Sequence, residues 1–472
     1  MSAAGHLLAA GAGLVGLIVL CGFGPSPSQC PGVDFIITAA PVYVPLAELR
    51  GGERFPGGAQ LLLVHEGKTE PLVQGFAATA DADISYDGES VLFAGKKAAA
   101  DNWQIWELNL ADHSLRQVTA TADDAVRPFH LPGQRLVWAQ HTPNGFELNS
   151  TDDGHPKDSY QLNPTAGPGV LPLTYIHASA FPTGVLRDGR ILFESGFPLG
   201  SGSTPEIYLV YADGSGVESY RCDHGHPRWN ARQLASGDVV FTHGASLARF
   251  TSPLAHEEPV AAPSAQYAGA IAETDSGAWL VSARMANGTH YSINLWRPAD
   301  SSHPQSAKLE KVLSTSGMDL LDPVVVAPHQ RPNRHPSGLH PWNYANLLAL
   351  DSRVSRDGVL RGTPMSVRLE TQDQNGRAQP AGTAPVEADG SFFVQVPGDR
   401  PIRFALLDRN GAVLRQEHGW FWIRGGEQRY CVGCHAGPER ASENRVPAVL
   451  MRTTTPVDLS KLSSARASQG GQ

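Results

Sequence analysis

Residues 84–119 read ISYDGESVLFAGKKAAADNWQIWELNLADHSLRQVT, and this stretch indicates how most of the chain folds. An Asp-Gly turn at 87–88 precedes a short apolar run at 90–94. Residues 103–108 then alternate apolar and polar side chains, as a half-buried strand does. A second turn leads to one more short strand at 115–119. The stretch therefore predicts a unit of short strands joined by tight turns.

Weaker copies of this unit recur at 131–138, 187–194 and 234–242. A repeat of about 40–55 residues made of short strands is typical of propeller blades, which bury their faces only by packing in a ring. We expect an all-β protein with a β-propeller of six or seven blades over residues 31–330. The repeats resemble those of TolB-type, WD40-like propellers. A split β-sandwich is the alternative for this region.

The chain changes character after the repeats. Residues 331–344 are rich in His and Pro, which predicts a connector without strands. Longer strands with hairpin signals then predict a small β-sandwich over 345–425. Residues 426–472 complete the chain as a haem-bearing segment and a tail, for the reason given next.

Cys431-Val432-Gly433-Cys434-His435 is the attachment pattern of a c-type haem. Cys431 and Cys434 can each form a thioether to one haem vinyl group, and His435 can bind the iron. A zinc half-site or a redox dithiol would be the alternatives, but the chain has no second C-x-x-C and no βαβ setting. The motif predicts one covalent haem c.

Little helical pattern surrounds the motif, so the sandwich and the propeller must cover the haem. The distal side of the iron is then open or holds a residue from distant sequence. The candidates for this distal position, or for a zinc site, are Cys222, His224, His226, His335 and His340. The alternative is a propeller loop with a buried Cys and turn-forming neighbours at 222–226, and solvated, turn-bracing histidines in the connector.

Residues 1–30 predict an export segment and linker, because 7–23 form a short apolar run suited to a signal peptide. Cys21 could carry a lipid, the segment could be cleaved without lipid, or it could remain as an anchor. Each outcome places the protein in the periplasm or on the outer surface of a bacterium, with membrane association only through the N-terminus. A net charge of −9 with 18% charged residues argues against a nucleic-acid partner.

The chain over residues 33–450 resembles proteins similar to the middle region of the hydrazine synthase alpha subunit. The stretches that carry the resemblance are 102–107, 334–340, 384–392, 426–435 and 443–447. The resemblance implies a propeller with a haem-bearing β module. It does not imply hydrazine synthesis, because that enzyme needs further subunits and a second haem in its alpha chain.

In that family a Tyr four residues beyond the motif His binds the iron, and the His turns to zinc. Glu439 occupies the matching position here, which favours ligation of the iron by His435. We therefore expect an exported monohaem redox protein that transfers electrons or acts on small nitrogen or oxygen compounds. Its partner is a periplasmic redox protein or a small molecule. The alternative is a propeller scaffold with a structural or sensory haem or zinc.

Overall fold

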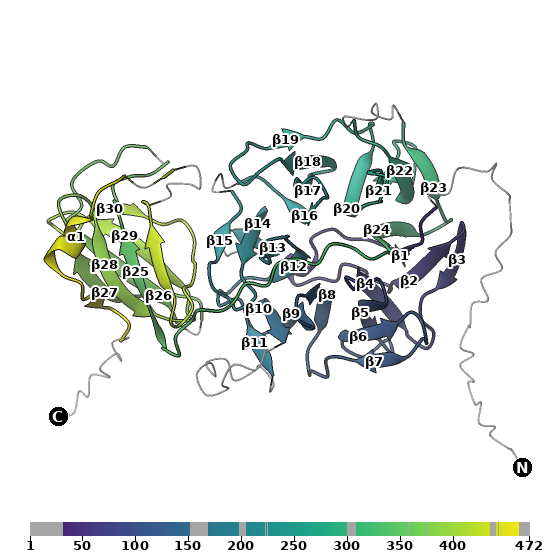
Figure 1. Ribbon diagram of the computed structural model, residues 1–472, viewed down its shortest axis with the longest axis horizontal. Coiled ribbons are helices and arrows are strands. Elements are labelled where there is room, and N and C mark those ends of the chain that lie inside the picture. The colour runs from purple at the N-terminus through teal and green to yellow at the C-terminus, as the bar shows by residue number, and fades with distance from the viewer. Residues whose placement is uncertain are drawn as a thin grey trace, which may run out of the picture.

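The computed structural model describes residues 32–151, 169–197, 204–221, 223, 225–299, 308–356, 358–373, 375–434, 440–441 and 443–461. Regular structure in these residues is almost entirely β, in two units joined by a long connector (Figure 1). The exceptions are the 3-10 turn η1 (Glu48–Arg50) and the short helix α1 (Ala448–Arg452). The all-β class predicted from the repeats is confirmed.

In the described residues, six four-stranded antiparallel sheets form the larger unit, a β-propeller. The first sheet contains β1 (Phe35–Ala40), β2 (Gln60–His65), β3 (Lys68–Pro71) and β24 (Asp319–Val325). The second contains β4 (Ala78–Ile84), β5 (Ser90–Lys96), β6 (Gln104–Asn109) and β7 (Leu115–Gln117). The third contains β8 (Ala125–Leu131), β9 (Arg135–Thr142), β10 (Gly145–Thr151) and β11 (Val170–Pro172).

The remaining three sheets follow in chain order. The fourth contains β12 (Ala180–Val185), β13 (Ile191–Phe197), β14 (Thr204–Val210) and β15 (Glu218–Ser219). The fifth contains β16 (Trp229–Gln233), β17 (Val239–His243), β18 (Ser246–Phe250) and β19 (Glu258–Pro259). The sixth contains β20 (Gln266–Glu273), β21 (Trp279–Arg284), β22 (Ser292–Trp296) and β23 (Glu310–Leu313).

Strand β24 closes the ring, because it comes from the far end of the propeller and pairs with β1. Phe35 lies opposite Val325 and Ala40 opposite Asp319 in this antiparallel pair. Phe35 and Leu320 have no exposed surface, so the closing pair belongs to a packed core. Closure removes the open sheet edges that an incomplete ring would leave to unwanted pairing.

The smaller unit consists of two four-stranded sheets that face each other across an apolar core. One contains β25 (Tyr344–Ala349), β28 (Phe392–Pro397), β31 (Gln428–Cys431) and β32 (Val457–Asp458). The other contains β26 (Ser366–Gln372), β27 (Ala378–Pro385), β29 (Ile402–Leu407) and β30 (Val413–Gln416). Strands β31 and β32 lie beyond residue 425, so this sheet includes part of the segment that we assigned separately to the haem motif.

The connector between β24 and β25 runs along the propeller, as Figure 1 shows. Its backbone is hydrogen bonded to two Asp-Gly turns of the repeats, from His329 N–H to Tyr86 and from Asn333 N–H to Arg187. Gly189, with φ at +90°, allows this approach, since a Cβ there would lie 2.2 Å from the Asn333 carbonyl oxygen. The repeat turns thus have a second use as a docking surface for the connector.

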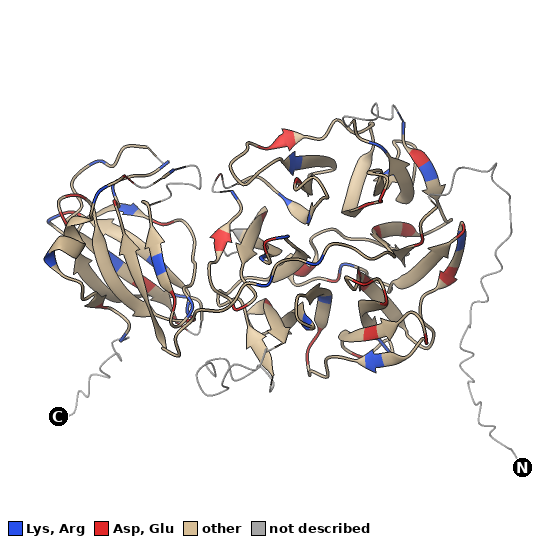
Figure 2. Cartoon of the chain, in the orientation of Figure 1, with Lys and Arg blue, Asp and Glu red and all other residues tan. Residues whose placement is uncertain are grey.

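Acidic and basic segments are interspersed over both units (Figure 2). Within the described residues, no helix is long and apolar enough to span a membrane. The predicted export segment lies outside those residues.

Candidate functional site

Cys431 is the last residue of β31, an edge strand of the sandwich. The strand pairs in parallel with β25, where Ala349 lies opposite Cys431. The turn that follows is pressed against Val354, because a Cβ at Gly433 would lie 2.6 Å from the Val354 carbonyl oxygen. The sandwich therefore holds the start of the haem motif through two contacts, the pairing of β31 with β25 and the packing of Gly433 on Val354.

The two motif cysteines lie on an apolar surface. Cys431 and Cys434 are half-buried, and with Leu360, Phe421 and Val457 they pack against the core between the sandwich sheets. The Cys431 thiol forms no disulfide with another described residue. Two thiols three positions apart on an apolar wall fit a haem, which needs two thioether links and apolar cover. His435, Cys222, His224 and Glu439 lie outside the described residues.

The environment of Cys431 favours the neutral form of its thiol when nothing is bound. Burial raises the pKa of the Cys431 thiol to about 11, and the carboxylates of Glu417 and Glu427 add to the rise against the opposing charge of Arg429. The thiolate is the form that binds zinc or attacks a disulfide. With nothing bound, Cys431 is therefore mostly a neutral thiol at neutral pH.

Glu417 is an ionisable group near this turn that sequence reasoning missed. It follows β30, and its Oε2 accepts a hydrogen bond from the Phe404 N–H at 3.1 Å. Burial of the carboxyl group raises the pKa of Glu417 to about 7, although the Phe404 hydrogen bond, Arg429 and Arg403 oppose the rise. Glu417 can therefore gain or release a proton near neutral pH, within electrostatic range of Cys431.

Arg424 joins the sandwich to the fourth sheet of the propeller. Its Nη1 pairs with Oδ1 of Asp399 at 2.6 Å, and these two side chains are 1% and 4% exposed. Its Nε donates to the Asp213 carbonyl oxygen at 2.8 Å, and Nη1 also donates to the Tyr175 hydroxyl. Gly214 leaves room for this contact, since a Cβ there would lie 2.8 Å from Arg424 Cδ. A buried charge is thus satisfied by partners from both units.

Trp422 fills the same interface with an almost fully buried indole ring. It belongs to the core of the third and fourth propeller sheets, with Phe193 and Leu173 among its neighbours in that core. Its Nε1 donates to the Gly214 carbonyl oxygen at 3.2 Å. Arg429, two residues before Cys431, donates to the carbonyl oxygens of Trp422 and Val217. The segment that leads into the haem motif is therefore anchored to the propeller.

A small cavity with aromatic walls lies between the fourth propeller sheet and the sandwich. It has space of about 60 Å³ for water-sized molecules. Its aromatic lining residues are Phe193, Tyr208, Trp420, Phe421 and Trp422. Because Phe421 also packs with the motif cysteines, the apolar wall of the motif continues to this cavity.

The described histidine candidates are spread over three places. His335 stacks on Tyr211 of the propeller with ring centres 3.8 Å apart. His340 stacks on Trp342 at 4.4 Å, and its carbonyl oxygen would lie 2.0 Å from a Cβ at Gly426. His340 is therefore next to the segment that leads to Cys431.

His226 is exposed on the loop before β16, and its ring lies 6.4 Å from that of His243. His243 itself is bonded through Nδ1 to Glu257, which also pairs with Arg228 at 2.7 Å. Within the part of the chain that the structure describes, no group of three or more His, Cys, Asp or Glu side chains is arranged to hold a metal ion. Of the predicted zinc or distal iron ligands, the described ones, His226, His335 and His340, therefore do not form a common metal site.

The comparison with known families decides what this site resembles. Residues 355–436 match the hydrazine synthase alpha subunit middle domain. The matched segment spans β26 to β31 and includes the haem motif. The resemblance expected from the motif stretches is confirmed for this part of the chain.

Among solved structures, hydrazine synthase from Kuenenia stuttgartiensis has the same fold, with a TM-score of 0.75 and 18% sequence identity. The match covers 89% of this chain and 72% of that one. TolB from Acinetobacter baumannii matches 62% of this chain and 66% of its own at 11% identity, with a TM-score of 0.44. No curated protein matches the sequence.

Proposed function

We propose that this chain is an exported redox protein that carries one haem c, held by thioethers to Cys431 and Cys434 with His435 as an iron ligand. Its activity is electron transfer or redox chemistry on a small nitrogen or oxygen compound. The partner is a periplasmic redox protein or the small molecule itself. The chemistry lies at the boundary of the sandwich and the propeller.

One observation carries this proposal. The haem-attachment motif begins at the end of a strand, on an apolar wall, and inside the segment that matches the hydrazine synthase alpha subunit middle domain. Haem, when bound there, supplies a one-electron redox centre. Residues of the chain supply the rest: Phe421 and Leu360 exclude water beside the thiols, and Glu417 holds a proton near neutral pH.

Covalent haem attachment tests the proposal directly. The chain is produced in bacteria with and without a c-type haem maturation system, and denatured protein is stained for haem and weighed by mass spectrometry. The expected result is one haem per chain, lost in the double variant Cys431→Ala/Cys434→Ala and retained in the control Cys222→Ala. Protein that stays haem-free in cells with the maturation system would overturn the proposal.

Export is tested separately through Cys21. Fractionation of cells that express the full chain should place it on the periplasmic side of the inner membrane. If Cys21 is lipidated, Cys21→Ala releases the protein from the membrane fraction and abolishes fatty-acid labelling. Full-length protein that remains in the cytoplasm would contradict the proposed location.

The second candidate function is a propeller scaffold in which a haem or zinc is structural or sensory. The contacts of Arg424 and Trp422 favour it, because they lock the motif segment onto the propeller instead of leaving it mobile. Redox titration separates the two functions. A metal centre that changes its redox state under physiological donors supports the first, and one that stays inert while the protein still binds a partner supports the second.

A further inference from the structure

The innermost strands of the propeller share an irregularity where they face the central axis. In the described residues, each of β4, β8, β12, β16, β20 and β24 has a register shift against its neighbour. Asp81, Arg127, Asn230 and Asp322 have positive φ at four of these bulges, with values between 49° and 61°. Bulges redirect side chains, and a left-handed backbone at non-Gly residues is strained, so both features mark functional positions.

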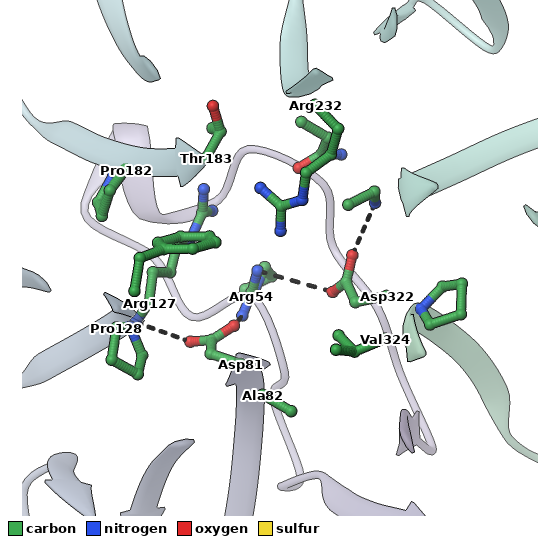
Figure 3. A pocket seen from close by; sticks show the side chains of 14 residues that line it. Arg54, Asp81, Ala82, Arg127, Pro128, Pro182, Thr183, Arg232, Asp322 and Val324 are labelled. Atoms are coloured by element: carbon green, nitrogen blue, oxygen red, sulfur yellow. Dashed lines mark hydrogen bonds and ion pairs between the residues drawn. The ribbon is translucent and has the colours of Figure 1, made fainter. Parts of the chain in front are cut away.

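These bulges surround a small cavity, which we call the axial cavity. Its charged and hydroxyl lining residues are Arg54, Asp81, Arg127, Thr183, Arg232 and Asp322. Figure 3 shows Arg232 pointing toward Arg54, which lies between Asp81 and Asp322. The cavity has about 30 Å³ of space open to water-sized molecules.

The carboxylates around the cavity already have partners. Asp81 pairs with Arg54 through Oδ1, and its Oδ2 accepts the Arg127 N–H at 3.1 Å. Oδ1 of Asp322 accepts the Ala270 N–H at 2.8 Å. The acceptors of the lining are therefore engaged with the protein itself.

Glu194 and Glu48 complete the acidic side of the network. Glu194 Oε1 pairs with Arg127 Nη1 at 2.5 Å, and its Oε2 accepts the Asn230 N–H at 2.8 Å. Glu48 Oε2 pairs with Arg127 Nη2 at 2.7 Å. Two of the five donors of Arg127 are thus used on carboxylates that lie behind the cavity.

Several donors of the lining are left over. The Arg54 Nε, the Arg127 Nε, the Asn230 Nδ2 and the Thr183 hydroxyl are buried and have no hydrogen-bond partner. The side chains of Arg54, Arg127 and Thr183 are less than one-tenth exposed. A buried unpaired donor costs about 1–3 kcal/mol, so four of them around one cavity indicate that an acceptor is missing.

Arg232 interacts with the carboxylates of Asp83, Asp322 and Glu194 only at distances longer than an ion pair. Its guanidinium lies over the Phe129 ring, 4.7 Å from the centroid, and makes no ion pair with a described carboxylate. Gly184 lies beside it, with Arg232 Nη1 3.6 Å from where a Cβ would be. Burial lowers the pKa of Arg232, as expected for a cation without a close counter-ion.

The size and the donor set limit the ligand. A water molecule needs roughly 10–15 Å³ of such space, so the cavity holds two or three waters or one ion of similar size. A water molecule has two hydrogens of its own, which would point at the donors that line the cavity. A carboxylate or similar oxyanion only accepts hydrogen bonds and so matches these donors better. A guanidinium binds a planar oxyanion with two parallel hydrogen bonds.

We propose that the axial cavity is a binding site for a small monovalent oxyanion of about three or four non-hydrogen atoms, with Arg232 as its counter-ion and Thr183 and Asn230 as further donors. The site is formed by the propeller alone and does not depend on the haem. A bound anion forms an ion pair with Arg232 and accepts hydrogen bonds from the unpaired donors. It therefore stabilises the propeller from its centre.

Formate is the probe for this site because it is small, planar and monovalent. Thermal unfolding and calorimetric titration of the full chain are measured in sodium formate against sodium chloride at equal ionic strength. We expect formate to raise the melting temperature with saturation and benzoate, which is too large, to have no such effect. Absence of a saturable formate response in the unaltered chain would overturn the proposal.

Variants locate the response. Arg232→Met should weaken formate binding about tenfold or more, because it removes the counter-ion without adding a polar group. Thr183→Val, which keeps both charge and shape, should weaken it less. The matched control is Arg249→Met, since Arg249 is on the outer strand β18, 40% exposed and paired with Asp238.

Equal formate affinities of the unaltered chain and of Arg232→Met would refute the proposed site. If Arg232→Met does not fold, Thr183→Val alone decides, and an unchanged formate affinity in that variant counts against the proposal. A crystal structure of the formate-soaked chain with only water in the axial cavity would also refute it.

Discussion

Arg424 and Arg232 occupy different parts of the molecule and differ in how their donors are used. Arg424, between sandwich and propeller, is bonded to a carboxylate, a carbonyl oxygen and a hydroxyl. Arg232, at the propeller axis, faces a cavity whose lining holds four further donors without a hydrogen-bond partner. The difference teaches that a satisfied buried arginine is a structural joint, whereas an unsatisfied one marks a place that a ligand completes.

The largest effect is expected when Arg424 is replaced, which tests whether this arginine joins the two units. Arg424→Met leaves Asp399 buried without its partner, and we expect a loss of about 3–5 kcal/mol in the free energy of unfolding. Urea unfolding followed by tryptophan fluorescence measures the loss. Arg116→Met is the control, because the Arg116–Glu107 pair is exposed and worth about 0–1 kcal/mol. Equal effects of the two variants would show that Arg424 is not a joint.

Glu417 extends the comparison to a carboxyl group on the sandwich side. Its pKa of about 7 lies above its value in the unfolded chain, so the folded state holds the extra proton between about pH 4.5 and 7. The stability that Glu417 contributes is therefore lost as the pH rises through that window, by about 3 kcal/mol.

Glu417→Gln keeps the shape of the protonated form, so the variant should be more stable than the unaltered chain at pH 8. Its free energy of unfolding should also vary less between pH 4.5 and 7. Urea titrations at a series of pH values test this. A parallel pH dependence in the two proteins would mean that Glu417 does not titrate in this range. Glu258→Gln, on the exposed strand β19, is the control.

Trp422→Phe sharpens the comparison at the joint itself. The ring stays apolar, but the hydrogen bond from Nε1 to the Gly214 carbonyl oxygen is lost and a small gap opens. We expect a loss of about 1–2 kcal/mol in unfolding free energy. Trp342→Phe, in the half-buried connector, should cost less. A smaller loss for Trp422→Phe than for this control would contradict its role in the interface.

The smallest change in the free energy of unfolding is expected for Arg232 at the propeller axis, and it is a gain in stability instead of a loss. Without a bound anion, Arg232→Met removes an unpaired charge from a desolvated site, so the unfolding free energy should rise by about 1 kcal/mol. Urea unfolding in buffer free of small oxyanions measures it. A clear destabilisation would show that Arg232 already has the partners that make Arg424 structural.

Much of the fold could be predicted from residues 84–119 and their copies, because blade strands and turns are set by local patterns. The bulges of the inner strands were missed, although Pro128, Pro182 and Pro323 within strand-like runs signal them. Glu417 was missed because its pKa depends on burial in the folded chain, on a hydrogen bond from the Phe404 N–H and on the charges of Arg403 and Arg429. No sequence spacing encodes that environment.

By itself, the sequence determined the all-β class, the repeats and the haem motif at Cys431 and Cys434, because each depends on neighbours close along the chain. Only the tertiary structure decided that Arg424 and Trp422 join the motif segment to the fourth propeller sheet, and that Arg232 makes no close ion pair at the axis. Those relations join residues tens to hundreds of positions apart, and packing sets them once the ring has closed.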